Sequence, residues 1–303
     1  MIPDYLDAEE SKYLLARSDL QAGWLVARTW LGVLGLLAFA EVAPHPISYL
    51  LIWILLPGRQ LGLAVLMHEA GHGTLFRSRW ANQLIGQWLC ALPTFNNLNA
   101  YAQRHLQHHR KVGTQEDPDL SNYDMYPIDR RSFFRKVIRD LTGQTGFKLL
   151  LSSGLFRVAQ FSDTGDGDRW ILLKQVGFQL CLLGLLMALG IGWTWLLWFG
   201  TFMTSYMFVI RLRQIAEHAA VPNANDTDPR LNTRTVDAPR WQLFLVAPNY
   251  VNFHMEHHLM PGIPCYHLAH FRTILKRKGL LADIPLFTSY WQVVSHTVMA
   301  RQS

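Results

Sequence analysis

Histidines in three short clusters carry the chemistry that this sequence suggests. Eight of the 13 histidines belong to the segments HEAGH, HLQHH and HMEHH. They are His68, His72, His105, His108, His109, His254, His257 and His258. Side chains at positions i, i+3 and i+4 of an α-helix share one face, so each segment is expected to present its histidines on one stripe. Two or three imidazoles in that arrangement are typical of a metal ion chelated from a helix.

The alternative to metal binding is that these histidines are packed or capped residues. One HxxxH segment would be weak evidence, but three clusters in one chain favour a metal site, because burying eight imidazoles without a shared partner is costly. Outside the clusters, His45, His267, His270 and His296 are expected to be packed or capped, and His218 is left open between packing and ligation. An all-imidazole site suits zinc, copper, iron or nickel, so the ligand type leaves the metal undecided.

Acidic side chains inside or beside the clusters can accept hydrogen bonds from the N–H groups of ligating imidazoles. The favoured candidates are Glu69, Glu217 and Glu256. Solvated carboxylates are the preferred interpretation for Glu116, Asp117 and Asp119. Asn252, just before the third cluster, could hold that segment or a metal-bound water, and packing is the favoured interpretation.

The composition indicates a membrane protein with a large polar part. Half of the 303 residues are hydrophobic and 17% are charged, against about 25% charged residues in a typical soluble domain. The mean hydropathy is only +0.07, so the chain cannot lie in a membrane throughout. This composition excludes disordered, collagen-like and disulfide-stapled proteins. We expect one domain over residues 1–303.

Four apolar stretches are long enough to span a membrane, since a bilayer core of roughly 30 Å needs about 20 apolar residues. They cover residues 24–43, 47–67, 170–189 and 193–210, with the second interrupted at Pro57-Gly58-Arg59-Gln60. The links at 44–46 and 190–192 are short, which predicts two tight helical hairpins. The expected fold class is therefore all-α and integral to the membrane. Arg59 has no evident role inside a span.

The positive charges predict which side of the membrane holds the polar part. Thirteen Lys and Arg residues lie between 68 and 169 and ten from 211 onward, whereas the two hairpin turns have none. By the positive-inside rule, both termini and a helical cap formed by residues 68–169 and 211–303 face the cytoplasm. The clusters would then meet at the inner membrane surface, within reach of a lipid tail. The spread of the basic residues disfavours nucleic-acid binding.

Shorter segments are expected to lie at the membrane surface. Residues 80–95 and 241–253 are too short or too polar to span, and 133–157 mixes Phe and Leu with Arg and Lys, as an interfacial helix would. Residues 162–168 read as a Gly/Asp-rich linker. A metal transporter or metal sensor is disfavoured, because its ligands would lie within the spans and the four spans contain no histidine.

The three clusters match, in order, the HxxxH, HxxHH and HxxHH boxes of the membrane fatty acid desaturase superfamily, which the chain resembles over residues 25–275. The resemblance implies two iron ions that use O2 to oxidise acyl chains or other lipids. It also implies that His218, in the segment RQIAEH, joins the eight clustered histidines as a ninth ligand. The expected reaction is desaturation of an acyl lipid from the membrane. A lipid hydroxylase or carotenoid ketolase of the same superfamily is the alternative.

The sequence departs from one branch of this superfamily, the front-end desaturases. Those enzymes often carry a fused cytochrome b5 domain with a His-Pro-Gly-Gly motif, and a Gln opens their third box. Here His45-Pro46 is followed by Ile47-Ser48, and the third box opens with His254. We therefore expect electrons to come from a separate donor, of the ferredoxin or cytochrome b5 type.

Overall fold

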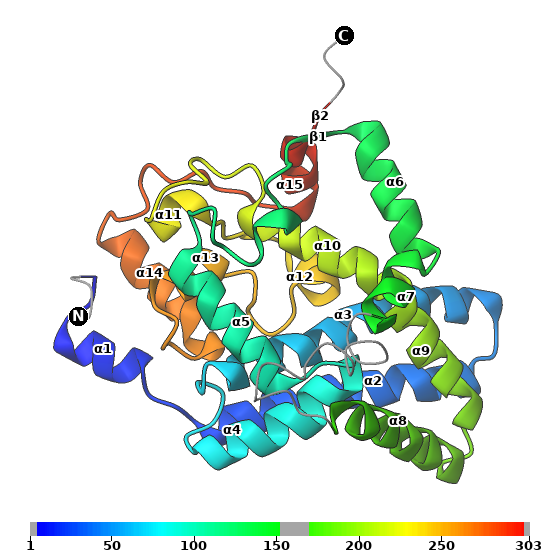
Figure 1. Ribbon diagram of the computed structural model, residues 1–303. Helices are drawn as coiled ribbons and strands as arrows, with labels where there is room; N and C mark the ends of the chain where they lie inside the picture. Colours follow the sequence, from blue (N-terminus) through cyan, green and yellow to red (C-terminus); the bar gives the residue numbers. More distant parts are fainter. Residues whose placement is uncertain (1–4, 152–169, 300–303) are drawn as a thin grey trace.

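The computed structural model describes residues 5–151 and 170–299, and this part of the chain is almost entirely helical. The linker expected at 162–168 lies outside the described residues. The two residues of β1 (Ile128–Asp129) pair in parallel with those of β2 (Val298–Met299), beside helix α15 (Tyr290–Thr297) (Figure 1). The described residues therefore have the mainly helical fold that the sequence predicts.

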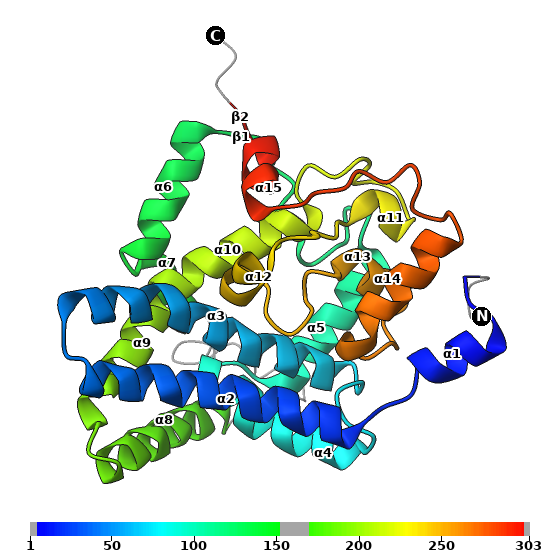
Figure 2. The ribbon, with the colours of Figure 1, turned by 180° about the vertical axis from the view of Figure 1, so that it is seen from behind.

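Four apolar helical segments are long enough to cross a membrane, as predicted. They are α2 (Asp19–Val42), α3 (Pro46–Gly71), α8 (Ile171–Ala188) and the segment Gly192–His218, which contains η6 (Gly192–Thr194), α9 (Trp195–Met203) and α10 (Ser205–His218). Both ribbon views show α2 and α3 running side by side (Figures 1 and 2). Their arrangement as hairpins across a bilayer, and the side on which the polar helices lie, stay predictions.

The fourth segment extends further than the sequence pattern predicts. After a break around Thr204, α10 continues past the expected end at residue 210 and finishes at His218. The apolar run stops at Arg211, whose Nε lies 2.5 Å from Oδ2 of the buried Asp140. The helix continues because arginine is a good helix former. His218 therefore occupies the last helical turn of α10, where its direction is fixed by the helix.

The interruption of the apolar stretch at residues 57–60 does not end α3, because the helix continues through Pro57. This segment is instead where α12 (Arg240–Val246) packs against α3. A Cβ on Gly58 would lie 2.7 Å from the carbonyl oxygens of Phe244 and Leu245, so glycine is required for the approach. Arg59 donates to the Phe244 carbonyl, and its guanidinium lies 3.7 Å from the centre of the Phe244 ring. Arg59 thus fastens α12 to α3.

The segments expected at the membrane surface are more divided than predicted. Residues 80–95 form α4 (Arg79–Ile85), the π-helical η1 (Gly86–Ala91) and η2 (Leu92–Thr94), and 241–253 begins with α12. The helix expected over 133–157 is two helices, α6 (Arg130–Leu141) and α7 (Gln144–Leu150). Gly143 between them has a φ of 81°, a conformation that ends a helix and favours glycine. The last residues of the expected helix, 152–157, lie outside the described residues.

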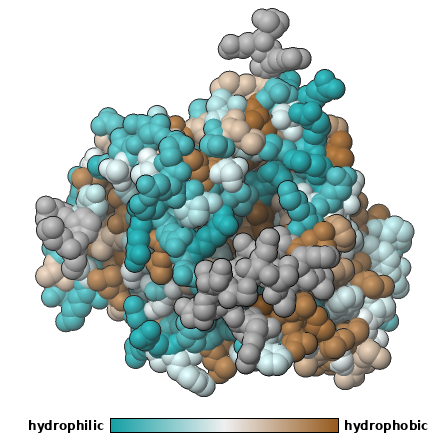
Figure 3. All heavy atoms as spheres, in the orientation of Figure 1, coloured by the Kyte–Doolittle hydropathy of each residue, from teal (hydrophilic) through white to brown (hydrophobic). Residues whose placement is uncertain are grey.

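The remaining helices form the polar part of the molecule. They are α1 (Ala8–Leu14), α5 (Leu98–Lys111), η3 (Leu120–Asn122), α11 (Pro229–Asn232), α13 (His254–Leu259), η7 (Cys265–His267) and α14 (Leu268–Arg277). Figure 3 shows hydrophilic residues gathered over α5 and α11 and hydrophobic residues over α8 and α9. One buried apolar cluster joins the two parts, because Leu66 and Met67 of α3 pack with Leu98 of α5 and Met255 of α13. This packing brings all three histidine clusters together.

Candidate metal centre

All nine histidines that were predicted as ligands come together in two adjoining groups. The first group consists of His68, His72, His105, His109 and His257. The second group consists of His108, His218, His254 and His258. In each group, every residue offers a ring nitrogen that lies within 4.8 Å of those of the others. The groups combine side chains from α3, α5, α10 and α13 and from the residue that follows α3.

The histidines of the second and third clusters lie on one face of their segment, as expected, with ring centroids no more than 6.0 Å apart, but they divide between the two groups. On α5, His105 and His109 enter the first group and His108 enters the second. On α13, His257 enters the first group and its neighbour His258 enters the second. Consecutive residues of a helix point about 100° apart, so one HxxHH segment can supply both groups. The rings of His109 and His258 stack with their centroids 4.1 Å apart, which makes the two groups adjoin.

The ring nitrogens that face one another have the spacing of ligands that share a metal ion. In the first group, Nε2 of His109 lies 3.0 Å from Nε2 of His105 and 2.9 Å from that of His257. In the second group, Nε2 of His218 lies 2.9 Å from that of His254. Nitrogens this close need a proton or a cation between them. With metal–nitrogen bonds of about 2.1 Å, the nitrogens of two ligands of one ion lie about 3.0–3.4 Å apart, so the spacing fits ligands that share an ion.

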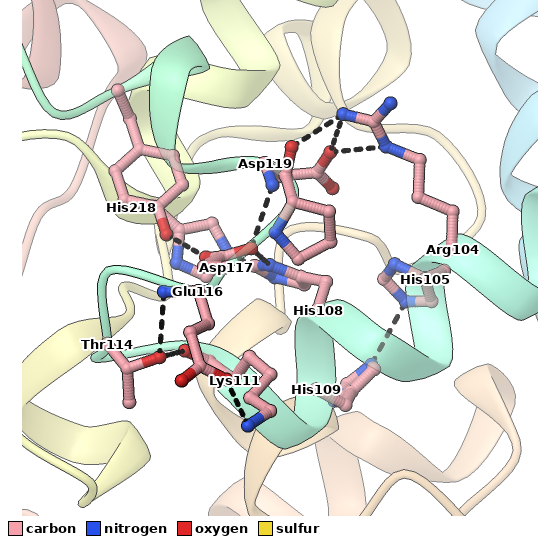
Figure 4. Close-up of polar contacts among 12 residues, drawn as sticks. Arg104, His105, His108, His109, Lys111, Thr114, Glu116, Asp117, Asp119 and His218 are labelled. Atoms are coloured by element: carbon pink, nitrogen blue, oxygen red, sulfur yellow. Dashed lines mark hydrogen bonds and ion pairs between the residues drawn. The ribbon is translucent and has the colours of Figure 1, made fainter.

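His108 is held by a chain of hydrogen bonds that Figure 4 shows. Its Nδ1 donates to Oδ1 of Asp117 at 2.8 Å, which leaves Nε2 facing Nε2 of His218 at 3.2 Å. Asp117 also accepts from the Tyr123 hydroxyl and from the Asp119 backbone N–H. Burial acts to raise the pKa of Asp117, but its hydrogen bonds outweigh burial and lower that pKa. The interpretation of Asp117 as a solvated carboxylate is therefore wrong.

Two of the favoured acidic residues, Glu69 and Glu217, lie beside predicted ligands. Nδ1 of His68 donates to Oε1 of Glu69 at 3.0 Å. Oε1 of Glu217 lies 3.5 Å from Nδ1 of His254 and 2.6 Å from Nε of Arg213. Each carboxylate thus contacts the Nδ1 side of a ring and leaves its Nε2 side for the group, which is the arrangement expected around metal-binding histidines.

Glu256 and Asn252 hold the third cluster in place. Glu256 is fully buried and accepts from Nη1 of Arg272 at 2.5 Å. It lies two positions from His254, which turns it to the opposite side of α13. The prediction that Glu256 accepts a hydrogen bond from a ligating histidine is therefore wrong for the described residues. The side chain of Asn252 donates to the Val236 carbonyl at 3.1 Å, in agreement with the packing interpretation.

The end of α10 is fixed by Arg234, a residue that no sequence pattern singles out. Its guanidinium donates at 2.9–3.3 Å to four carbonyls at the end of this helix, those of Ile215, Ala216, Ala219 and Ala220. The last carbonyls of a helix have no partner within the helix, and a cation there also offsets the helix dipole. Arg234 therefore positions His218. A lone arginine in a polar stretch gives no signal of this role.

The four histidines that were expected to be packed or capped lie outside both groups. Nδ1 of His45 accepts a backbone N–H at the start of α3 at 3.2 Å. Nε2 of His296 donates to a backbone carbonyl at 3.0 Å. The rings of His267 and His270 pack against Tyr13, with centroids 5.0 and 5.2 Å from that of its ring. These local contacts agree with the sequence-based interpretation.

Comparison with known proteins gives the two groups a context. Residues 44–290, which include all nine histidines, match the family described as fatty acid desaturase. The chain belongs to the fatty acid desaturase family. Together with the four apolar helices, this membership makes the protein a membrane oxidoreductase.

Individual relatives in the fatty acid desaturase family have names that differ in the reaction and in the substrate. A dihydrorhizobitoxine desaturase of Bradyrhizobium elkanii is 29% identical over 71% of this chain, and the match spans 64% of that relative, just under two thirds. A beta-carotene ketolase of Paracoccus sp. is 26% identical over 86% of this chain and 94% of the relative. An sn-1 oleoyl-lipid 12-desaturase of Picosynechococcus sp. is 25% identical over 78% of this chain and 71% of the relative.

Burial lowers the pKa of most imidazoles in this desaturase-family centre, which favours their neutral form. It lowers the pKa of His72 to about 3, and it lowers the pKa values of His105, His109, His257 and His258 well below their ordinary value. A neutral ring has a lone pair for a metal, and a protonated ring does not. Nε2 of His72 and Nε2 of His258 are also buried without a hydrogen-bond partner among the described residues. The nitrogen donors therefore fit a metal ion in each group.

Proposed function

We propose that the protein uses two irons and O2 to oxidise the aliphatic chain of a lipid, and that the reaction is desaturation. The five-histidine group would hold one iron and the four-histidine group the other. The observation that carries the proposal is the pair of adjoining, all-imidazole groups in a member of the fatty acid desaturase family. Imidazole ligands alone allow several metals, and the family membership supports iron.

The irons, when bound, would supply the power to oxidise an unactivated C–H bond with O2. In the overall reaction, two adjacent CH2 groups lose one hydrogen each and become a C=C bond. O2 takes up these two hydrogens, two electrons and two protons, and it leaves as two water molecules. The two electrons would come from a separate donor of the ferredoxin or cytochrome b5 type.

The protein's own residues would orient the ligands. Asp117 accepts from Nδ1 of His108 at 2.8 Å, and the Asn232 carbonyl accepts from Nδ1 of His218 at 3.3 Å. These bonds fix each ring in the tautomer whose Nε2 carries the lone pair, which also raises its strength as a ligand. The burial of the rings keeps water from competing for the same positions.

A lipid hydroxylase or carotenoid ketolase is the second candidate. It is supported by the match to the beta-carotene ketolase, which extends over 94% of that relative. The same nine histidines would serve all three reactions. The products differ, because desaturation removes two hydrogens, hydroxylation adds one oxygen, and ketone formation adds one oxygen and removes two hydrogens.

The test is expression in a bacterial host of known lipid content, with and without a carotenoid pathway, followed by mass spectrometry of its lipids. We expect lipids that have lost two hydrogens in cells that express the wild type. Cells that express His108→Ala or His257→Ala should contain no such new lipids. Oxygen-containing lipids or ketocarotenoids would favour the second candidate. Unchanged lipids in cells whose purified protein contains two irons per chain would contradict desaturation of the host's lipids.

We also propose that both termini and the metal centre face the cytoplasm, on the basis of the Lys and Arg distribution. A reporter fused to the C-terminus tests this side directly. A fluorescent protein that matures only in the cytoplasm should fluoresce when it is fused to the C-terminus. An alkaline phosphatase that is active only in the periplasm should be inactive in the same position. The reverse result would place the centre on the other side of the membrane.

A further inference from the structure

Helix α6 carries three arginines in a row on the surface of the protein. Arg131, Arg135 and Arg139 follow one another at intervals of four residues, so they share one side of the helix. All three side chains are exposed. Like charges at this spacing repel one another and weaken a helix, so an anion bound between them would stabilise it. These three residues are called the arginine row below.

The described carboxylates near α6 leave the arginine row without an ion-pair partner. Asp129 caps the start of the helix by accepting the Ser132 backbone N–H at 2.8 Å. Asp140 near its end is fully buried and binds Arg211. The ion pairs among the described residues involve other cations than the arginine row. Even with the exposed Asp124 nearby, the five basic residues of α6 outnumber these three carboxylates.

A surface cavity of about 370 Å³ lies at the start of the arginine row. Arg130, Arg131, Arg135 and Asp129 line it. Three guanidinium groups against one carboxylate leave the lining with an excess of positive charge, and arginine keeps its proton throughout the physiological pH range. A guanidinium binds phosphate oxygens through paired hydrogen bonds. The cavity therefore suits a phosphate group.

An apolar row runs along α6 beside the arginine row. Phe134, Ile138 and Leu141 are 64%, 43% and 45% exposed. Their spacing of four and three residues places them together on one side of the helix. A helix that exposes an apolar row next to a basic one is typical of helices that lie on an anionic membrane surface. The apolar row thus favours a lipid over an acidic protein or a nucleic acid as the partner.

Packing joins α6 and α7 to the fourth apolar segment of the fold. Phe133 packs against a buried cluster that contains Ile215 of α10. A Cβ on Gly146 of α7 would lie 2.3 Å from the carbonyl oxygen of Met203, the last residue of α9. Both ribbon views show α6 running across the direction of α2 and α3 (Figures 1 and 2). If α2 and α3 cross a bilayer, α6 therefore lies along its surface.

We propose that α6 binds the headgroups of anionic phospholipids through the arginine row, while the apolar row enters the bilayer beside them. The partner is the phosphate-bearing surface of a membrane. This inference goes beyond the proposed function, and it depends neither on the metal centre nor on the reaction. Bound headgroups would offset the repulsion along the row and hold the polar part of the molecule in one orientation on the membrane.

Lipid binding can be measured on the full-length protein by native mass spectrometry from detergent. The protein would be titrated with phosphatidylglycerol and with phosphatidylcholine of the same acyl chains, which is zwitterionic. Each arginine near an anionic surface strengthens binding about fivefold, so the wild type should bind phosphatidylglycerol at least tenfold more tightly. Replacing Arg131, Arg135 and Arg139 together with Gln should weaken phosphatidylglycerol at least tenfold and leave phosphatidylcholine unchanged. Replacing the same three with Lys keeps the charge and should keep most of the preference.

The matched control removes three positive charges from another surface. Lys276, Arg277 and Lys278, at the end of α14, are all exposed. They pair with the carboxylates of Asp237 and Glu10. In both ribbon views α14 and α6 lie on opposite sides of the molecule (Figures 1 and 2). Replacing these three residues with Gln should therefore leave the preference for phosphatidylglycerol unchanged.

Equal affinity of the wild type for the two lipids would overturn the proposal. So would unchanged phosphatidylglycerol affinity in the Gln variant of the arginine row, or an equal loss in the α14 control, which would reduce the effect to net charge. A wild type without lipid preference, whose Gln variant loses binding to an acidic ferredoxin used as a probe, would make the row a protein-docking site instead. If the Gln variant fails to fold, the wild-type preference and the Lys variant still decide the question.

Discussion

Replacing Asp117 with Asn should release the metal of the four-histidine group and spare that of the five-histidine group. The amide keeps the size of the carboxylate but removes the charge that accepts from Nδ1 of His108 at 2.8 Å. Asp117 is only 5% exposed, so water has little access to replace that interaction. Loss of such an outer hydrogen bond weakens metal binding about 10- to 100-fold, which corresponds to about 1.4–2.7 kcal/mol.

The assay is iron retention against a series of chelator concentrations, measured on reduced protein by mass spectrometry of the metal. At a chelator concentration where the wild type keeps two irons per chain, Asp117→Asn should keep close to one. Glu116→Gln is the matched control, because the neighbouring Glu116 is 70% exposed and pairs with Lys111. An affinity within threefold of the wild type, or equal loss from both groups, would refute the assignment of Asp117 to the second group.

Three further variants and a change of pH probe other parts of the account. His72→Ala should remove the iron of the five-histidine group and His258→Ala that of the four-histidine group, so each variant should retain about half of the wild-type iron by metal analysis. Arg234→Ala should lower the free energy of unfolding by about 3 kcal/mol, because it removes charge-assisted hydrogen bonds at the end of α10; an unchanged denaturation midpoint would contradict that role. The metal-free protein should lose stability as the pH falls below about 6.5, since burial lowers the pKa values of the folded histidines and the unfolded chain binds protons first. Each such histidine should contribute about 1.4 kcal/mol per pH unit, and a melting temperature that is flat between neutral pH and pH 5 would contradict the burial argument.

The residues of the metal centre could be predicted from the sequence because metal binding restricts both residue type and spacing. Three clusters identify eight histidines, and the family resemblance adds His218. Their division into groups of five and four could not be predicted in the same way. His108 and His109 point about 100° apart on one helix, and the group that each joins depends on how α3 and α10 lie across α5.

The partners of these histidines were harder to predict, because closeness in sequence is a poor guide to contact. Glu256 lies inside a cluster and points away from its rings, whereas Asp117 follows His108 by nine residues and folds back onto it. Arg59 had no evident role in a span, because its partner is a carbonyl 185 residues later in the chain. These contacts depend on tertiary packing, which spacing alone does not encode.

The four apolar helices could be predicted because the thickness of a bilayer sets their length. Their ends were less certain from the sequence. The apolar pattern stops at Arg211, yet α10 continues to His218, because arginine is as good a helix former as most apolar residues. The apolar pattern therefore marks where the hydrophobic stretch ends, and the helix can continue beyond it.

The most direct test of the central claim is Mössbauer spectroscopy of the reduced, iron-loaded protein, combined with metal analysis of the same sample. Nine histidines in groups of five and four should give two irons per chain and two ferrous signals of equal area, because the two sites differ in ligand number. A protein that holds one iron per chain, or that binds zinc and rejects iron, would contradict the account.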